Sequence, residues 1–311
     1  MGILLDKATD VVVQGATGKE GKRVVAAMRA YGTRVSCGVT PGKGGTVSDD
    51  LPVFSDVRAA CAAFPALNAS VIVVPPFAAK EAILEAIEAG IPLISVMTER
   101  MPMRDAAYCF ATAKEHGIRI IGPASLGIIV PGVGRLGVIG GPLVDEIFTP
   151  GSVGVISRSG GMTNELSWSV RQAGLGQSAA VHVGGDSLLG TSYADALRLF
   201  EADPETEAVV VYGEQGGACE FEIASLVRKG QFTKPIAVHV GGDFAKALPE
   251  GAVVGHAGAI VRRGQSAADK AKVLSESGVL VAERFDDLVQ SVKPLISHAH
   301  HDTHLAHHQG R

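Results

Sequence analysis

The sequence predicts an α/β fold with two open sheets, because short apolar runs alternate with stretches of helical period along the chain. An apolar run at 11–14 precedes a helical pattern at 22–30, and the same order recurs at 70–89 and at 93–116. This alternation is typical of parallel βαβ units. Since the runs carry few polar residues, we expect strands buried on both faces, with helices on each side of the sheets.

A second series of strands predicts a second domain. A run of Gly and Pro over 122–150 interrupts the first series, and apolar runs resume at 153–156, 179–183, 208–212 and 236–239. A chain of 311 residues is long enough for two domains with separate cores. We therefore expect one domain over 1–127 and another over 128–296.

The segment 297–311 differs in character from the rest of the chain. It holds six of the ten histidines and shows no apolar period. Tracts rich in histidine can bind metal, but an end segment without periodicity is more often disordered. We expect a disordered tail and no metal site.

The composition argues against several classes of protein. Hydrophobic residues make up 46% and charged residues 19%, which is too apolar for a disordered chain and too interrupted by charge and glycine for a membrane protein. A net charge of -4 without a basic run argues against a nucleic-acid-binding surface. The four cysteines show no paired spacing, and the N-terminal segment does not resemble an export signal. We expect a cytoplasmic protein whose partners are small molecules or other proteins.

The hexapeptide Val-His-Val-Gly-Gly-Asp occurs twice, at 181–186 and at 238–243. Each copy stands where a strand is expected to end. Two similar strand ends are enough to produce such a match, so we interpret it as local similarity rather than as an internal repeat.

A glycine-rich loop follows the first expected strand. Gly15, Gly18 and Gly21 would let backbone amides approach a phosphate at the start of a helix, although ordinary strand-to-helix turns share this spacing. An NAD site should have Asp or Glu at the end of the second strand, and neither stands there. Lys43, in the loop after that strand, suits a ligand with an extra phosphate on its ribose, such as CoA or NADP.

A histidine between glycines is the strongest candidate for catalysis. A flexible loop at 251–260 would let the His256 imidazole move between two sites and carry a phosphoryl group, although a lone histidine is more often a packed or surface residue. Glu214, at the end of another expected strand, could orient the ring and favour its phosphorylated form. We expect an anion cradle at a strand-to-helix turn, which a plain serine-capped helix would also explain. Its candidate residues are Ser157, Ser159, Gly160, Gly161 and Asn164.

Segments in these loops resemble the alpha subunit of the succinyl-CoA synthetase family over about residues 1–296. They include Gln-Gly-Ala-Thr-Gly-Lys-Glu-Gly, Gly-Val-Thr-Pro-Gly-Lys-Gly-Gly, Ser-Arg-Ser-Gly, Gly-Glu-Gln-Gly-Gly and Gly-His-Ala-Gly-Ala-Ile. The resemblance implies a Rossmann-like CoA-binding domain, a flavodoxin-like ligase domain and a phosphohistidine at His256 supported by Glu214. It also implies CoA-contacting positions at Thr17, Gly18, Lys19, Glu20, Lys43, Val74, Pro75, Thr98 and Glu99.

The resemblance further implies an enzyme built from two kinds of subunit. In the family, ATP or GTP and Mg²⁺ bind a separate ATP-grasp beta subunit. Phosphate passes through the histidine to the acid, and the CoA sulfur then displaces phosphate from the acyl phosphate. We find no ATP-grasp pattern in this sequence, so we expect a heterodimer or heterotetramer with such a partner.

Two departures from the family pattern leave the identity of the acid substrate open. Where the family has Asn-Cys-Pro-Gly, this chain has Ala124, Ser125, Leu126 and Gly127. Where the succinate enzymes have Thr-Leu-Thr-Tyr-Glu, it has Gly-Met-Thr-Asn-Glu at 161–165, which is similar to ATP-citrate lyase and citryl-CoA synthetase. A Gly in place of Thr and the loss of the Tyr bulk would enlarge the pocket or expose more amides. Succinate, citrate and a sulfonated or other small acid are therefore the candidate substrates.

Two alternatives of other classes stay open. The first is a CoA-binding regulatory subunit without turnover, against which the presence of both His256 and Glu214 argues. The second is an NADP-dependent oxidoreductase, which the glycine loop and Lys43 of the first domain alone would also fit.

Overall fold

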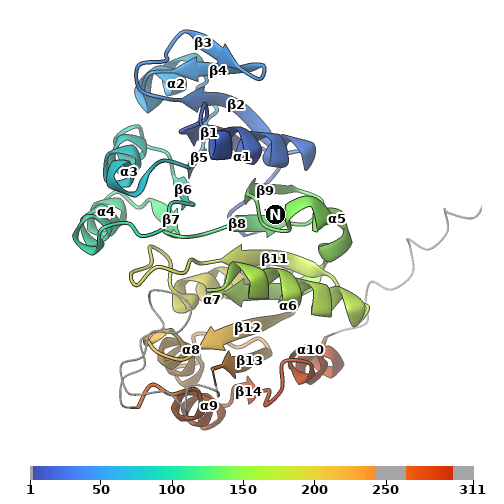
Figure 1. Cartoon of the computed structure of the whole chain (residues 1–311). Coiled ribbons are helices and arrows are strands. Elements are labelled where there is room, and N and C mark those ends of the chain that lie inside the picture. The colour runs from blue at the N-terminus through green and yellow to red at the C-terminus, as the bar shows by residue number, and fades with distance from the viewer. Residues whose placement is uncertain (1–2, 243–263, 297–311) are drawn as a thin grey trace, which may run out of the picture.

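The computed structural model describes residues 3–242 and 264–296, which form two seven-stranded sheets with their covering helices (Figure 1). Among the described helices, none combines the length and the apolar character needed to span a bilayer.

The first sheet has the strand order β3-β4-β2-β1-β5-β6-β7, and every neighbouring pair is parallel except β3 with β4. The order reverses at β1, whose neighbours are β2 on one side and β5 on the other. Its strands are β1 (Asp10–Gln14), β2 (Arg34–Val39), β3 (Thr46–Ser48), β4 (Leu51–Phe54), β5 (Ala69–Ile72), β6 (Leu93–Val96) and β7 (Arg119–Ile121). Its helices are α1 (Lys19–Ala30), α2 (Val57–Ala63), the 3-10 helix η1 (Pro76–Ala78), α3 (Ala79–Glu88) and α4 (Met103–Glu115).

The second sheet has the order β14-β13-β12-β10-β11-β8-β9 and reverses at β10 in the same way. Its strands are β8 (Gly127–Val130), β9 (Gly134–Gly137), β10 (Pro150–Ser157), β11 (Gln177–His182), β12 (Ala208–Glu214), β13 (Ile236–Gly241) and β14 (Leu280–Val281). Its helices are η2 (Gly141–Leu143), α5 (Val144–Ile147), α6 (Gly160–Gln172), α7 (Tyr193–Ala202), α8 (Cys219–Arg228), α9 (Ala267–Ser275), α10 (Asp287–Val292) and η4 (Lys293–Leu295).

Alternation along the strands explains why helices cover both faces of each sheet. Successive side chains of a strand point to opposite faces. Val11 and Val13 of β1 belong to the core cluster that contains helix α1, whereas Val12 belongs to the cluster that contains α3 and α4. In the second sheet, Ile156 packs with α7 and α8, and its neighbour Val155 packs with α6 and α10. The predicted α/β fold, with strands buried on both faces, is confirmed.

The Gly- and Pro-rich run over 122–150 contains regular secondary structure and is not simply a break between two series of strands. Strands β8 and β9 form an antiparallel hairpin there, and β8 pairs antiparallel with β11 at the edge of the second sheet. The glycines permit close backbone approach, since a Cβ on Gly127 would lie 1.6 Å from the carbonyl oxygen of Leu136. The alternation of strands and helices indicates parallel units, so it could not reveal this hairpin.

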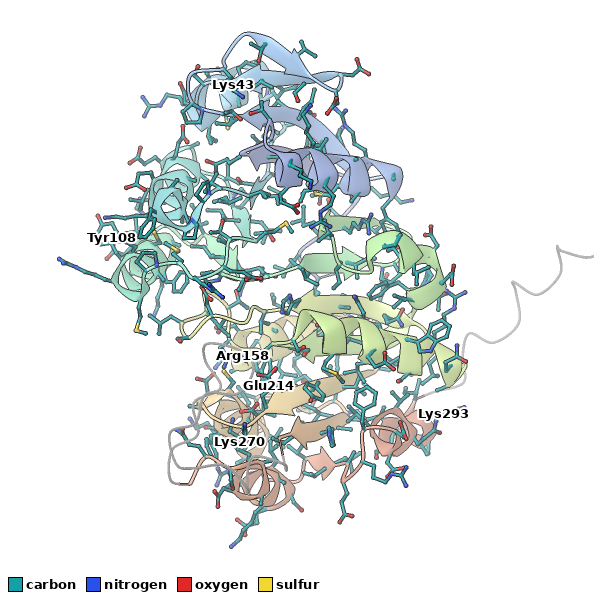
Figure 2. All side chains as sticks on the ribbon, viewed as in Figure 1. Lys43, Tyr108, Arg158, Glu214, Lys270 and Lys293 are labelled. Atoms are coloured by element: carbon teal, nitrogen blue, oxygen red, sulfur yellow. The ribbon has the colours of Figure 1, made fainter. Side chains whose placement is uncertain are left out.

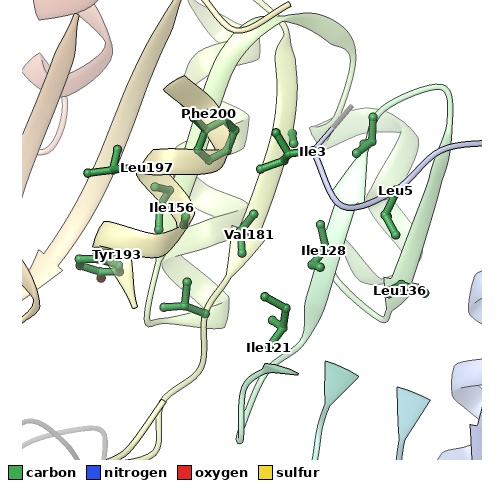
Figure 3. Close-up of a cluster of buried hydrophobic side chains, with 14 of the residues drawn as sticks. Ile3, Leu5, Ile121, Ile128, Leu136, Ile156, Val181, Tyr193, Leu197 and Phe200 are labelled. Atoms are coloured by element: carbon green, nitrogen blue, oxygen red, sulfur yellow. The ribbon is translucent and has the colours of Figure 1, made fainter. Parts of the chain in front are cut away.

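One buried apolar cluster joins the two sheets (Figure 3). Ile3 and Leu5, from the N-terminal segment, belong to the same cluster as Val13 of β1 and Met28 of α1 in the first domain and Val181 of β11 in the second. Burial of apolar side chains stabilises by about 25 cal/mol for each Å² removed from water. The N-terminal segment therefore helps to hold the first sheet against the second.

Arg135 of β9 makes the polar part of this junction. It is 3% exposed, and its guanidinium donates to the carbonyl oxygen of Ala27 in α1 at 2.7 Å and 3.1 Å and to that of Ile139 at 3.0 Å. Its backbone amide donates to Thr33 Oγ1 at 2.8 Å, and Thr33 Oγ1 donates to the Arg135 carbonyl oxygen. Burial lowers the pKa of Arg135 from its usual value, which shows that solvation no longer supports the charge and that hydrogen bonds must.

We expect Arg135→Met to lower the free energy of unfolding by about 2 to 4 kcal/mol, because it removes the guanidinium hydrogen bonds to the carbonyl oxygens of Ala27 and Ile139. Urea denaturation followed by circular dichroism measures the change. Arg34→Met is the matched control, since Arg34 is half exposed in its ion pair with Asp10. Equal stability of the two variants would contradict a role for Arg135 in joining the sheets.

Candidate active site

The first glycine loop is closely packed against the end of a neighbouring strand. Gly15 has φ +85°, and a Cβ at this position would lie 2.2 Å from the Val73 carbonyl oxygen. A Cβ on Gly21, in the first turn of α1, would lie 2.2 Å from the Gly15 carbonyl oxygen. Any larger residue at either position would push apart β1, α1 and the loop after β5. The loop thus brings the start of α1 close to the edge of the sheet.

Four loops meet at the carboxyl edge of the first sheet, after the adjacent parallel strands β2, β1, β5 and β6. Lys43 Nζ donates to Thr17 Oγ1 at 3.3 Å, which joins the loop after β2 to the glycine loop. Thr98 Oγ1 donates to the Val74 carbonyl oxygen at 2.7 Å, which joins the loops after β6 and β5. Ligands of open α/β sheets bind at such an edge, where the strand order reverses. The residues expected at the CoA site all fall on these loops or on the first turn of α1: Thr17, Gly18, Lys19, Glu20, Lys43, Val74, Pro75, Thr98 and Glu99.

A strand-to-helix turn of the same kind stands at the reversal point of the second sheet, between β10 and α6. Ser159 caps α6, since its Oγ accepts a hydrogen bond from the Met162 amide at 3.3 Å. Ser157 Oγ accepts one from the Ser159 amide at 2.9 Å. The first amides of a helix have no acceptor within the helix, and the helix dipole favours an anion there. The turn therefore has the form of an anion cradle as well as that of a capped helix.

The two glycines that open α6 have different surroundings. A Cβ on Gly160 would lie 2.4 Å from Leu126 Cδ1, so the Leu126 side chain closes that side of the turn. A Cβ on Gly161 would meet no atom of residues 3–242 or 264–296 within 4 Å. Within the described part of the chain, the space in front of Gly161 is therefore open to a ligand.

Asn164 is oriented by a bond within the protein. Its Oδ1 accepts a hydrogen bond from the Gly140 amide at 3.0 Å, in the loop between β9 and η2. This bond engages the amide oxygen, which leaves the Nδ2 hydrogens as the donors that Asn164 can offer to an anion.

His182 connects the cradle to Leu126, one of the residues that depart from the family pattern. It is 4% exposed at the end of β11, and its Nδ1 accepts from the Leu126 amide at 2.7 Å. Its Nε2 lies 2.8 Å from the Arg158 carbonyl oxygen, which can only accept, so the ring carries its hydrogen on Nε2. Leu126 and Arg158 are thus held at a set separation through one imidazole ring.

Glu214 lies at the end of β12, next to the end of β13. Its backbone amide donates to Glu220 Oε1 at 2.9 Å, and its carbonyl oxygen accepts from Lys270 Nζ at 2.6 Å. Lys270 Nζ also donates to the Gly216 carbonyl oxygen and pairs with Glu220 Oε2, and both charged side chains are almost fully buried. Figure 2 shows Arg158, Glu214 and Lys270 in the same half of the molecule, remote from Lys43. The buried pair therefore fixes the backbone that carries Glu214.

The expected nucleophile, His256, lies outside the described residues, as does the tail 297–311. The described chain ends at Gly242, just after β13, and resumes at Gly264, just before α9, which carries Lys270. The two described ends of this loop therefore flank the strand end that carries Glu214.

Two protonatable side chains near the cradle stay neutral. Burial raises the pKa of the Cys219 thiol to about 11, so this thiol is a weak nucleophile in neutral solution. Burial, followed by the nearby carboxylates of Glu220 and Glu214, raises the pKa of Tyr193 well above its usual value. The Tyr193 hydroxyl instead accepts from the Arg158 amide at 3.1 Å and donates to the Tyr212 carbonyl oxygen at 2.8 Å. Neither group carries the negative charge that would repel an anion.

Sequence reasoning missed Lys270, Glu220 and His182 as supporting residues. Lys270 shares the buried stripe of α9 with Ala267 and Leu274, so a lysine in an apolar stripe was the available signal. Glu220 likewise lies among the buried residues of α8. Their partnership joins positions 50 residues apart in the sequence, which no local pattern reports.

We expect Lys270→Met to lower the free energy of unfolding by about 3 to 5 kcal/mol, because it leaves the buried Glu220 carboxylate without its partner. Replacing both residues, as Lys270→Met with Glu220→Leu, should recover part of that loss. Chemical denaturation measures all three proteins. Lys272→Met, two positions along the same helix on an exposed side chain, should change stability by less than about 0.5 kcal/mol. Equal losses for Lys270→Met and Lys272→Met would exclude a structural role for the buried pair.

Comparison with known proteins assigns each half of the chain to a protein family. Residues 6–100 match the CoA binding domain family, and residues 156–293 match the CoA-ligase family. The alpha 2 subunit of ADP-forming succinate–CoA ligase from Archaeoglobus fulgidus is 43% identical over 298 residues, which cover 95% of this chain and 100% of that protein. The alpha subunit of malate–CoA ligase from Methylorubrum extorquens is also 43% identical, over 91% of this chain and 94% of its own length.

A solved structure is similar to this chain in fold. ATP citrate lyase from Methanothrix soehngenii, in complex with citrate and coenzyme A, is similar with a TM-score of 0.86 and 27% identity. The similarity covers 94% of this chain and 50% of that one, so the chain spans about half the length of that protein. With two matched families and near-complete alignments to named ligase subunits, the chain belongs to the family of alpha subunits of ADP-forming CoA ligases that includes succinate–CoA ligase.

Proposed function

We propose that this chain is the alpha subunit of a nucleotide-dependent ligase that makes the CoA thioester of a small di- or tri-acid through a phosphohistidine at His256 and an acyl phosphate. One observation carries the proposal. The cradle at the start of α6 and the fixed strand end of Glu214 lie at the carboxyl ends of neighbouring strands, in the same chain as a CoA-type glycine loop.

The residues of the first domain fit CoA. The Gly15 turn lets a ligand approach the backbone of β1, and Lys43 offers an exposed cation beside Thr17 for a phosphate. The loops of Val74 and Thr98 lie next along the edge and would line the rest of the ligand. When bound, CoA supplies the thiol that attacks the acyl phosphate. The domain division at 127 and 128 would then separate CoA binding from phosphoryl transfer.

The second domain would support the phosphoryl steps mainly by positioning and charge. Glu214 would accept a hydrogen bond from one ring nitrogen of His256, which leaves the other nitrogen free to take the phosphoryl group. The amides of Gly160 and Gly161, at the positive end of α6, would face the phosphate oxygens. Phosphoryl transfer depends on such placement and on charge neutralisation more than on covalent help from the protein.

The acid would be bound where the chain departs from the succinate pattern. The relatives are named for succinate, malate and sulfoacetate, and the similar citrate lyase was determined with citrate. The open space beyond Gly161 favours an acid that is larger or more branched than succinate. We therefore keep succinate, citrate, a sulfonated acid and another small acid as candidates and rank the larger acids first.

The partner would be an ATP-grasp beta subunit that holds ATP or GTP with Mg²⁺, in a heterodimer or heterotetramer. The relatives are themselves alpha subunits of ligases, which supports a second kind of subunit. His256 would take phosphate from the nucleotide on that partner and return to the cradle of this chain.

Thioester formation by the co-expressed pair tests the proposal. The purified complex is given ATP, Mg²⁺, CoA and in turn succinate, malate, citrate, itaconate and sulfoacetate. We expect turnover with at least one acid, and His256→Ala should lower kcat by about four orders of magnitude or more because it removes the nucleophile. His116→Ala, at an exposed position after α4, should leave turnover unchanged.

Incorporation of labelled phosphate distinguishes the alternatives. A regulatory subunit would bind CoA without phosphorylation of His256, and an oxidoreductase would bind NADP in place of CoA. Labelled phosphohistidine in the wild type and none in His256→Ala would exclude both.

The opening at Gly161 predicts a change in acid preference. Gly161→Thr adds bulk where no atom of the described residues lies within 4 Å, so the fold should tolerate it and the melting temperature should stay close to that of the wild type. The ratio of kcat/KM for the largest accepted acid to that for the smallest should fall by about 10- to 100-fold, which is the range that pocket size usually controls. Ser169→Thr, later in the same helix, should leave this ratio unchanged. An unchanged ratio in Gly161→Thr would place the acid elsewhere.

A further inference from the structure

Asp186 makes hydrogen bonds both to the loop after β6, at the expected CoA site, and to Arg158, at the anion cradle. It stands in the loop after β11 and is 8% exposed. It is the last residue of the first of the two identical hexapeptides, to which sequence analysis assigned no role. In Figure 1, the loop between β11 and α7 lies on the same side of the molecule as α3 and α4.

On the CoA side, the Asp186 carboxylate holds the loop after β6. Oδ1 accepts from the Arg100 amide and Oδ2 accepts from the Met101 amide, both at 3.2 Å. These residues follow Thr98 and Glu99 directly and precede α4. Arg100 has φ +58°, a conformation that costs energy for a residue other than glycine and needs support from its surroundings. A carboxylate that accepts two amide hydrogens near a helix start provides that support.

On the ligase side, the Asp186 backbone holds Arg158. The Asp186 carbonyl oxygen accepts from Arg158 Nη2 at 2.7 Å, and the Gly184 carbonyl oxygen accepts from Nε at 3.5 Å. Arg158 is 5% exposed and lies between Ser157 and Ser159 of the cradle. One residue thus contacts the loop of Thr98 and the side chain at the base of the cradle.

Packing alone does not hold this junction. A cavity of about 140 Å³ borders it, lined by Met101, Met103, Ala106 and Leu188 together with Arg100, Asp186 and Ser187. Hydrogen bonds join the two loops beside this cavity: the Arg100 and Met101 amides donate to Asp186, the Ala124 amide donates to the Thr98 carbonyl oxygen at 2.8 Å, and the Gly185 amide donates to the Ala124 carbonyl oxygen at 3.2 Å.

We propose that Asp186 is a positioning residue that sets the CoA-side loop against the phosphate cradle. It would be needed for the step that joins the two sites, in which the CoA sulfur attacks the acyl phosphate, and not for phosphorylation of His256 by nucleotide. A displacement of 1 Å between reacting groups can cost about 100-fold in rate, so loss of this link should affect the joining step strongly. The inference rests on the proposed function.

Two routes to phosphohistidine separate these steps. In the first, the complex receives labelled ATP and Mg²⁺. In the second, it receives labelled inorganic phosphate and the CoA thioester of the acid that turns over in the assay above: a phosphate oxygen displaces CoA thiol from the thioester, and the His256 nitrogen then displaces the carboxylate from phosphorus and releases a proton. Only the second route requires the CoA site and the cradle together.

In Asp186→Asn, one oxygen acceptor is replaced by an NH₂ group that faces a backbone amide, so the link to the loop is broken on one side. We expect phosphorylation from ATP to stay within about 2-fold of wild type and the route from acyl-CoA to slow by at least about 10-fold. The matched control is Asp203→Asn, which changes a carboxylate that is 5% exposed, caps the end of α7 and accepts from Thr206 Oγ1 at 2.6 Å, far from the junction.

The outcomes are distinct. Equal loss by both routes in Asp186→Asn, or loss by neither, overturns the positioning role. A similar selective loss in Asp203→Asn also overturns it, because a general loss of stability would then explain the effect. Absence of phosphohistidine from ATP in the wild-type complex contradicts the proposed function itself, whatever the variant does.

Discussion

The direction of the parallel strands is the constraint on which both sites depend. In each sheet the central strands run the same way, so the loops that follow them meet at one edge. The order reverses at β1 and at β10, and the two neighbouring loops at each reversal separate to leave room for a ligand. Helices α1 and α6 begin at these two points, where their dipoles favour an anion. In the proposed function, the same arrangement would serve a phosphate-bearing cofactor in one sheet and a phosphoryl group in the other.

Two sites in one chain can act on the same reaction only if the distance between them is fixed by the fold. The shared core around Ile3 and Leu5, with Arg135 on one flank, holds the sheets together on the side of α1 and β9. At the carboxyl edge, the contacts of Asp186 join the loop after β6 to the loop after β11. The two sets of contacts differ in kind. The shared core is mostly apolar and therefore non-directional, whereas the hydrogen bonds of Asp186 are polar and directional. Directional bonds are the better means of fixing a loop beside reacting groups.

Local patterns in the sequence predicted most of the fold. The apolar runs at 11–14, 93–96 and 208–212 lie within β1, β6 and β12, because a buried parallel strand is recognisable from a few consecutive residues. The glycine loop and the cradle were also expected from local spacing. The hairpin β8–β9 was not, and neither was the pair of Lys270 with Glu220, because both depend on partners far along the chain. Periodicity reports which face of an element is buried, but it does not report what that face meets.

The departures from the family pattern near the cradle form one physical unit. Proline has no amide hydrogen, whereas Leu126, which stands at the proline position of that pattern, has one and needs an acceptor in a buried turn. His182 Nδ1 supplies it, and the same ring donates to the Arg158 carbonyl oxygen beside Ser159. The Leu126 side chain in turn closes the space at Gly160 and leaves the space at Gly161 open. The Leu126 amide therefore depends on an acceptor from β11, and Leu126 and His182 together shape the region where the acid is expected to bind.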